Sequence, residues 1–231
     1  ATPFVGTPLV ITAGRNHTCI TSPSEGLTPC YGDNSQNQLQ APGDPFFAMS
    51  AGYDHTCGIL YNGEVRCWGS TTWWSSSPPS TPARQITSGD EYSCAILDGG
   101  ALECWWGASV GFSTPSGQFI QIDGGGAHLC GIRDGDIPFC VGEDGWGQVS
   151  GMPSGITFSK LSAGDRHSCG IDAAGALHCW RTSMPTARLS CWWARRASSS
   201  TPPRSGACLL TLTVAPNPNP NPNLDPDPNP Q

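Results

Sequence analysis

The sequence predicts an all-β fold, a complete or partial β-propeller with blades of about 37 residues, each stapled by a cross-strand disulfide. A C-terminal tail of polyproline II or disordered chain follows the blades. Three observations predict this fold. A motif with two cysteines recurs five times, each copy carries a hairpin pattern, and 29 glycines and 22 prolines in 231 residues favour short strands and turns over long helices.

The repeat defines the organisation of the chain. The first cysteine of successive copies recurs every 36 to 39 residues, a period typical of propeller blades. We assign the repeats to residues 1–180, a degenerate sixth unit or closure segment to 181–215, and an X-Pro tail to 216–231. The five units lie around residues 13–32, 51–69, 88–107, 124–142 and 163–181.

Each unit has the pattern of a hairpin that joins its two cysteines. In the second unit the run YNG fits a three-residue loop with glycine in the left-handed conformation. In that register Ile59 faces Val65 and Cys57 faces Cys67, so all four share one face of the hairpin. Facing cysteines favour a disulfide, worth about 2–3 kcal/mol for so short a loop. The predicted pairs are Cys19–Cys30, Cys57–Cys67, Cys94–Cys104, Cys130–Cys140 and Cys169–Cys179.

Two other uses of the cysteines stay open at this point. A zinc site needs C-x-x-C knuckles or histidines at ligand spacing, which the ten-residue separation lacks, although His178 adjoins Cys179. A redox pair needs C-x-x-C beside a helix start. We therefore expect disulfides, with no metal site and no cofactor. Cys191 and Cys208 are left over, and Cys191–Cys208 is their candidate pairing.

An apolar strand precedes each hairpin and ends in Ala-Gly or a similar pair, as in PLVITAG before the first unit. One unit thus supplies three or four short antiparallel strands, which is the content of a propeller blade. A blade of this size cannot bury its own faces, so we expect each blade to stack on its neighbours.

The motif Ala-Gly-x-x-His-x-Cys-Gly-Ile, followed by Gly-x-Val-x-Cys-Trp-Gly, resembles the regulator-of-chromosome-condensation-like repeat. The cysteine-bearing extracellular type is the most similar, as in Crinkly-type receptor kinase ectodomains and secreted bacterial and algal proteins. The resemblance covers roughly residues 5 to 180. It implies a propeller, usually of seven blades, but it does not fix the function. Its members include exchange factors, receptor ectodomains and hydrolase inhibitors.

One slot of the motif holds a histidine in four units and a tyrosine in the remaining one: His17, His55, Tyr92, His128 and His167. Because tyrosine cannot easily replace a zinc-bound imidazole, we interpret the slot as a scaffold position whose ring bonds nearby backbone. The glycine three residues earlier serves close backbone packing or positive φ. We find no nucleophile–base arrangement and no G-x-S-x-G, so the sequence predicts that the chain is not an enzyme.

Exposed aromatic pairs can bind sugars or peptides by stacking. The candidate binding residues of this kind are Trp73, Trp74, Trp192 and Trp193, although packing between blades is the alternative. Asn16 begins an N-x-T sequence and is a candidate for N-glycosylation.

The tail PNPNPNPNLDPDPNPQ cannot form a helix or a central strand. It resembles hydroxyproline-rich glycoproteins, and this resemblance implies hydroxylation and O-glycosylation. The residues concerned are Pro216, Pro218, Pro220, Pro222, Pro226, Pro228 and Pro230.

The net charge of −7 and the lack of a basic patch argue against nucleic-acid binding. No apolar run approaches the eighteen residues of a membrane span, and the chain starts without Met, which predicts a removed signal peptide or a fragment.

Twelve cysteines favour an extracellular or cell-surface location. We expect a non-catalytic structural or interaction protein of a cell-surface, cell-wall or filament assembly, with a protein or glycan partner or self-assembly. A ligand-binding receptor-type ectodomain or a secreted hydrolase inhibitor is the alternative.

Overall fold

The computed structural model describes residues 10–21, 26–70, 77–106 and 113–181. The chain divides into two units, Ala1–Met184 and Pro185–Gln231, and the second lies outside the described residues. The first unit consists of five three-stranded antiparallel sheets, one for each predicted repeat. The predicted all-β fold of disulfide-stapled propeller blades is confirmed.

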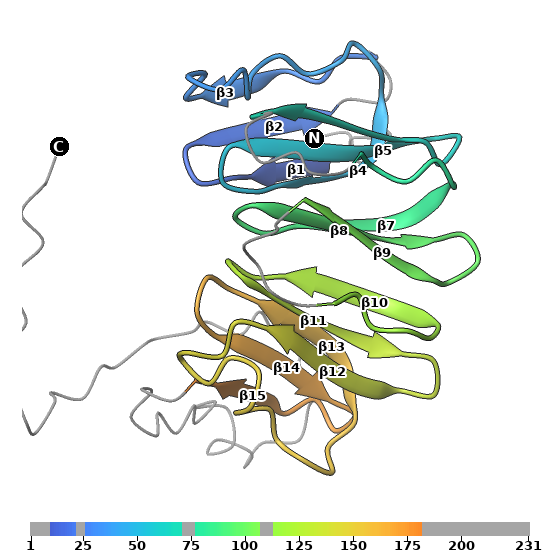
Figure 1. Ribbon diagram of the computed structural model, residues 1–231, viewed down its shortest axis with the longest axis vertical. Helices are drawn as coiled ribbons and strands as arrows, with labels where there is room; N and C mark the ends of the chain where they lie inside the picture. Colours follow the sequence, from blue (N-terminus) through green and yellow to red (C-terminus); the bar gives the residue numbers. More distant parts are fainter. Residues whose placement is uncertain (1–9, 22–25, 71–76, 107–112, 182–231) are drawn as a thin grey trace, which may run out of the picture. The chain divides into compact units, whose positions relative to one another are not determined.

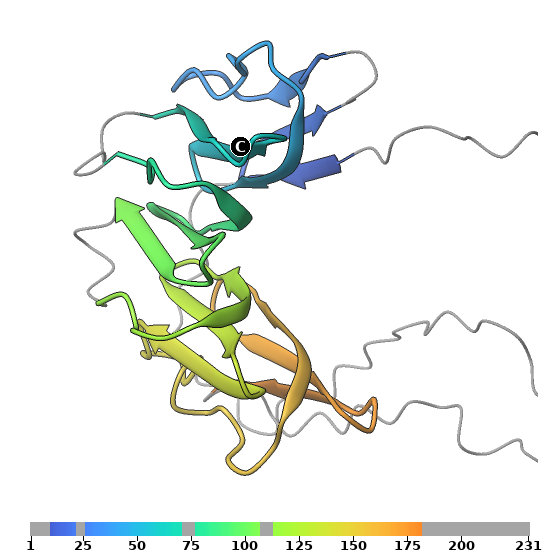
Figure 2. The same ribbon diagram turned by 90° about the vertical axis from the view of Figure 1, so that its right-hand side faces the viewer.

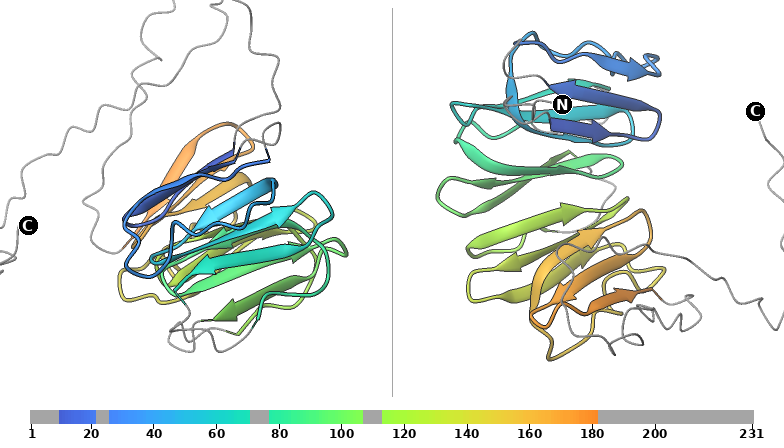
Figure 3. Two further views of the ribbon diagram at one scale, coloured as in Figure 1. Left: turned by 90° about the horizontal axis from the view of Figure 1, so that it is seen from above. Right: turned by 180° about the vertical axis from the view of Figure 1, so that it is seen from behind.

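Each blade contributes an inner, a middle and an outer strand in chain order, and successive blades pack face to face (Figures 1 and 3). The first two blades contain β1 (Val10–Ala13), β2 (His17–Thr21), β3 (Cys30–Gly32), β4 (Phe46–Ala51), β5 (His55–Leu60) and β6 (Val65–Gly69). The third and fourth contain β7 (Ala83–Ser88), β8 (Tyr92–Leu97), β9 (Leu102–Trp106), β10 (Phe119–Gly124), β11 (His128–Arg133) and β12 (Ile137–Gly142). The fifth contains β13 (Phe158–Ala163), β14 (Ser168–Asp172) and β15 (Leu177–Trp180).

The hairpins between middle and outer strands have the predicted register. In blade 2, Cys57 lies opposite Cys67 and Ile59 opposite Val65, and Gly63 in the turn has a φ of +85°. That left-handed backbone conformation favours glycine, which has no Cβ to clash. The same register places the two cysteines of every blade within reach of each other. The structure contains the disulfides Cys19–Cys30, Cys57–Cys67, Cys94–Cys104, Cys130–Cys140 and Cys169–Cys179.

The hydrophobic core lies between blades, as the small size of one blade requires. We call the face of a blade that carries the disulfide its leading face and the opposite face its trailing face. At the second junction, Ile59 and Val65 from the leading face of blade 2 pack against Ile86 and Trp105 from the trailing face of blade 3. The other three junctions repeat this arrangement. Figure 2 shows the sheets following one another in chain order along the stack. Each blade is therefore stable only as part of a stack.

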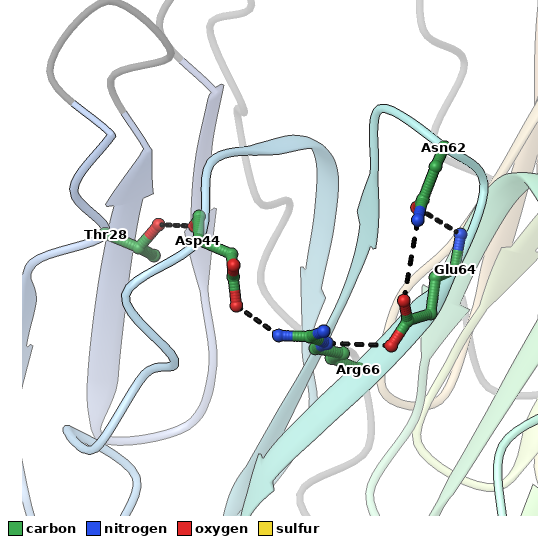
Figure 4. A network of polar contacts seen from close by, with 5 residues as sticks. All are labelled: Thr28, Asp44, Asn62, Glu64 and Arg66. Carbon is green, nitrogen blue, oxygen red and sulfur yellow. Dashed lines mark hydrogen bonds and ion pairs between the residues drawn. The ribbon is translucent and has the colours of Figure 1, made fainter.

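A polar network anchors the turn of blade 2 to the connection that leads into that blade (Figure 4). Arg66 forms ion pairs with Asp44 and with Glu64, the latter at 2.9 Å between Nε and Oε1. The Asn62 side-chain oxygen accepts a hydrogen bond from the Glu64 N–H at 3.0 Å, and the Thr28 hydroxyl donates to the Asp44 carbonyl at 3.2 Å. Because the charged side chains of Asp44, Glu64 and Arg66 are largely solvent-exposed, whereas Thr28 is buried, the ion pairs contribute little to stability.

Candidate functional site: a polar pocket where the inner strands end

The inner strands β1, β4, β7, β10 and β13 all end at one polar pocket with a volume of about 610 Å³. Each blade contributes consecutive residues from the start of its repeat motif. The lining consists of Ala13, Gly14, Arg15, Ala51, Gly52, Tyr53, Ser88, Gly89, Asp90, Gly124, Gly125, Gly126, Ala163, Gly164, Asp165 and Arg166. The pocket thus joins five segments that lie far apart in the sequence.

Backbone contacts between blades fix the wall of this pocket. The N–H of Arg15 donates to the Gly52 carbonyl at 3.2 Å, and the N–H of Asp90 donates to the Gly126 carbonyl at 2.9 Å. In blades 1 to 4 the glycine of the Ala-Gly or equivalent pair packs closely against the next blade. A Cβ on Gly52, for example, would lie 2.2 Å from the Gly89 carbonyl oxygen. Of the two predicted roles for these glycines, close packing applies here, because none of the five has a positive φ.

The residue after that glycine is of four types in the five blades and gives the pocket its chemistry: Arg15, Tyr53, Asp90, Gly126 and Asp165. The Arg15 guanidinium carbon lies 4.0 Å from the centre of the Tyr53 ring, a favourable cation–π contact. Arg166 pairs with Asp165 at 3.4 Å between Nε and Oδ2. The sequence contained a signal for this position, since it varies inside a motif that is otherwise nearly constant, but the motif alone does not show that the copies converge.

The electrostatics of the pocket are mixed. Burial raises the pKa of Asp90 above its usual value, and the carboxylate of Asp165 raises it further, whereas Arg15 and Arg166 lower it. Two arginines and two aspartates therefore face one polar space whose volume lies within the small-ligand range. Such a lining suits a polar peptide or sugar more than an apolar ligand. Within the described residues, no group of three or more His, Cys, Asp or Glu side chains could hold a metal ion.

The histidine slot lies at the junctions between blades. His17 Nε2 lies 2.7 Å from the Thr56 hydroxyl, His55 Nε2 lies 2.9 Å from the Ser93 hydroxyl, and His128 Nε2 lies 2.8 Å from the Ser168 hydroxyl. The scaffold interpretation fits these contacts. The ring reaches a hydroxyl of the next blade, and His55 also has the expected backbone partner, at Tyr92. Burial lowers the pKa of His17, and it lowers the pKa of His55 and of His128 to about 4. These rings are therefore neutral at pH 7.

Of the other predicted site residues, only Asn16 lies in the part of the chain that the structure describes. Asn16 is exposed beside the first pocket segment, and its glycosylation stays a prediction. The remaining candidates lie outside the described residues: Trp73, Trp74, Cys191, Trp192, Trp193, Cys208 and the tail prolines. No helix among the described residues is long and apolar enough to cross a membrane.

Residues 48–72, which include β5 and β6, match the regulator of chromosome condensation (RCC1) repeat. The second repeat is thus similar to the RCC1 repeat, and the other four share its cysteine motif. No curated protein sequence matches the chain significantly.

The structure is similar to two receptor kinase ectodomains. The ectodomain of CR4 from Physcomitrella patens is 32% identical with a TM-score of 0.66, and the match covers 78% of this chain and 53% of that one. The CRINKLY WD40 ectodomain of ACR4 from Arabidopsis thaliana is 26% identical with a TM-score of 0.63, covering 76% of this chain and 64% of that one. The chain thus spans about half to two thirds of these proteins. It is a disulfide-rich propeller of the extracellular type, similar to receptor ectodomains.

A more distant structure shows the same fold. Prp20p from Saccharomyces cerevisiae, which binds Gsp1p and histones, is 14% identical with a TM-score of 0.63, and the match covers 78% of this chain and 59% of that one. The similar structures are thus receptor ectodomains and RCC1-like binding proteins.

Proposed function

We propose that this chain is a non-catalytic extracellular interaction protein that recognises a protein or glycan at the polar pocket. One observation carries the proposal: a frame of nearly constant glycines and backbone hydrogen bonds presents residues that vary between blades, namely arginine, tyrosine, glycine and two aspartates. Rigid presentation of variable residues suits recognition, because little conformational freedom is lost on binding. The X-Pro tail, residues 216–231, serves as a stiff spacer that joins the propeller to a cell-surface, cell-wall or filament assembly.

The five disulfides support the extracellular part of this proposal, because such bonds persist in oxidising compartments. The similarity to the CR4 ectodomain, at 32% identity, favours a second candidate. In that case the chain binds one defined ligand in the manner of a receptor ectodomain or a secreted hydrolase inhibitor, and it takes no part in an assembly.

The test uses full-length secreted protein and asks whether it stays with the cell surface or enters the medium. The pocket variant Arg15→Ala/Asp165→Ala removes one positive and one negative side chain from the lining. Its matched control, Glu64→Ala/Arg66→Ala, removes the same two kinds of charge from the exposed rim. We expect wild type and control in the surface fraction and the pocket variant in the medium.

Peptide mapping of the same material checks the tail and the disulfides. The assembly role predicts hydroxyproline or glycan on the tail prolines and no free thiol in the five blade pairs. Equal release of all three proteins, together with an unmodified tail, would contradict the assembly role. Release of all three, with a soluble ligand that binds wild type and control but not the pocket variant, would favour the receptor-type alternative.

A further inference from the structure

The two ends of the blade stack differ from its four internal junctions in one respect. At an internal junction, an inner-strand residue of the trailing face is almost fully buried: Met49, Ile86, Ile122 and Leu161 have exposed fractions of 9, 8, 2 and 3%. Ile11 occupies the same position in blade 1, and 66% of it is exposed. Tyr31, which corresponds to the buried Trp68, Trp105 and Trp180, is 61% exposed. Within the part of the chain that the structure describes, the trailing face of blade 1 is thus an uncovered half of a junction.

The leading face of blade 5 is uncovered in the same way. Ile59, Ile96 and Ile132 are at most 1% exposed at the internal junctions, whereas their counterpart Ile171 is 39% exposed. Leu177, opposite Ile171 in the register, is 37% exposed, although its counterparts Val65 and Leu102 are buried. Isolated exposed apolar residues are ordinary, but a set whose equivalents are buried at most internal junctions marks an interaction surface.

Polar groups at the two ends also form complementary sets. At each internal junction, a side chain of one blade accepts a hydrogen bond from a backbone N–H in the inner strand of the following blade. Thr12 accepts from Ala51 at 2.8 Å, Ser50 from Ser88 at 2.8 Å, Thr87 from Gly124 at 2.7 Å and Asp123 from Ala163 at 2.9 Å. Blade 5 offers Ser162 at this position, and blade 1 offers the N–H of Ala13.

The histidine contact has its two halves at the ends as well. At three internal junctions, the histidine ring of one blade bonds a hydroxyl of the following blade. That hydroxyl belongs to the residue directly after the following blade's own slot. Within the described part of the chain, His167 of blade 5 has no such hydroxyl from a following blade. Thr18 of blade 1 corresponds to Thr56, Ser93 and Ser168, the hydroxyl partners at those junctions. One end of the stack therefore carries the ring and the other end carries its hydroxyl.

We propose that the leading face of blade 5 binds the trailing face of blade 1 from a second copy of this chain, head to tail. The contact repeats the internal junction: Ile171 and Leu177 pack against Ile11 and Tyr31, and His167 bonds Thr18. A contact between two different faces produces a closed ring or an open filament, depending on the rotation between copies.

The chain's own residues 181–215 fit this face less well. When Cys208 is aligned with the first cysteine of a unit, Pro203 takes the place of the close-packed glycine. Ala207 then replaces the hydroxyl residue, and Ser200 replaces the buried apolar residue of the inner strand. Because proline cannot provide the close backbone approach of glycine, this segment lacks the chemistry that blade 1 has. A second copy is therefore the favoured occupant.

This inference deepens the proposed assembly role, but it uses the end faces and not the pocket. The test measures the molar mass of full-length protein by light scattering across concentrations up to about 100 µM, a range that detects micromolar association. Three variants carry the same substitution: Ile11→Asp on the trailing end face, Ile171→Asp on the leading end face, and Ile120→Asp as control. Ile120 is 49% exposed but belongs to blade 4, away from both ends.

We expect wild type and Ile120→Asp to form dimers or larger species with rising concentration, and each end-face variant alone to remain monomeric. An equimolar mixture of Ile11→Asp and Ile171→Asp should give a dimer and nothing larger, because only one pair of intact faces remains. The pocket variant should associate like wild type even if it loses its surface partner, which separates this inference from the proposed function.

Monomeric wild type at the highest concentration, or a mixture that stays monomeric, would overturn the proposal. Hydrogen exchange of the wild-type chain provides a second readout. If β14 and β15 are protected in a monomer, and Leu210→Asp/Leu212→Asp removes that protection, then the chain's own C-terminal segment covers this face and the second copy does not.

Discussion

The junction between blades 3 and 4 differs from the other three internal junctions. At those three, a histidine reaches a serine or threonine hydroxyl of the next blade. At the third, Tyr92 takes the histidine slot and Leu129 the hydroxyl position. The Tyr92 hydroxyl then donates to the backbone carbonyls of Gly125, at 3.2 Å, and of His128. The ring and its partner have changed together, so the two positions that meet across a junction are matched as a pair and not residue by residue.

The two kinds of junction also differ in how they respond to acid. Burial lowers the pKa of His55 and of His128 to about 4, whereas burial raises the pKa of Tyr92 above its ordinary value. The tyrosine remains neutral from acid to neutral pH, but the histidines gain a proton when the chain unfolds below pH 6.5. The comparison therefore predicts histidine junctions that are sensitive to pH and a tyrosine junction that is not.

Acidification should have the largest effect. Between pH 6.5 and about 4 the unfolded chain binds more protons at His55 and His128 than the folded chain does, so the free energy of unfolding falls as pH falls. The loss approaches about 3 kcal/mol for each histidine. Urea unfolding at a series of pH values measures it, and hydrogen exchange should show the histidine junctions opening before the tyrosine junction.

The variant His55→Gln/His128→Gln is the control for this experiment, because glutamine keeps a hydrogen-bonding side chain that does not titrate. Its unfolding free energy should depend less on pH over the same window. The raised pKa values of Asp90 and Asp123 act in the opposite direction, since these carboxyls favour the folded state as pH falls. An unfolding free energy that is equal at pH 6.5 and 4.5 in both proteins would rule out the histidine mechanism.

Gly125→Ala should destabilise the protein by about 3 kcal/mol. The added Cβ would lie 2.3 Å from the Gly164 carbonyl oxygen and 2.2 Å from His128 Cε1, and the backbone oxygen cannot move aside easily. Thermal unfolding with intact disulfides measures the effect. Gly43→Ala is the control, because its Cβ would meet nothing within 4 Å. If the two variants unfold alike, then close glycine packing does not hold the blades together.

The exchange of partners at the third junction can be tested by a double-mutant cycle. Tyr92→His alone should lower the free energy of unfolding by about 1–3 kcal/mol, because the buried ring would face Leu129 instead of a hydroxyl. Adding Leu129→Ser to that variant should cost less than Leu129→Ser costs in wild type. The coupling energy from urea unfolding is the quantity of interest. Additive effects of the two substitutions would argue that the residues at this junction vary independently.

Arg66→Ala should have the smallest effect, less than about 1 kcal/mol. Its ion pairs with Asp44 and Glu64 lie at the rim and take no part in a junction (Figure 4). High salt should reduce the small difference from wild type further, since exposed charges are screened. A loss greater than 2 kcal/mol would mean that the connection between blades 1 and 2 depends on this arginine.

Sequence reasoning predicted what is local in the chain. The spacing of Cys57 and Cys67 around a glycine turn is enough to define the hairpin register, because side chains alternate with period two. The partner of His55 could not be predicted in the same way, since Ser93 lies in another repeat and their contact depends on how blades stack. A signal was nevertheless present. The hydroxyl after the slot is missing only at Leu129, and the ring that faces this position, Tyr92, is the only one that is not histidine.

The pocket was beyond sequence reasoning for a related reason. Arg15 and Asp165 come from the first and last blades, and only the packing of all five blades places them around one space. The variation at the residue after each Ala-Gly or equivalent pair could have identified these residues as candidates. It could not have shown that they line the same pocket.

The confinement of each disulfide to a single hairpin has a mechanical consequence. Each bond joins residues only 10 or 11 positions apart. When tension is applied to the chain ends, the residues inside each disulfide loop cannot extend. Each hairpin therefore keeps about 30 Å of chain from being stretched until its disulfide is reduced. The blades can then separate from one another under load while each keeps its own loop closed. Extension would be limited and would recover once the force is removed.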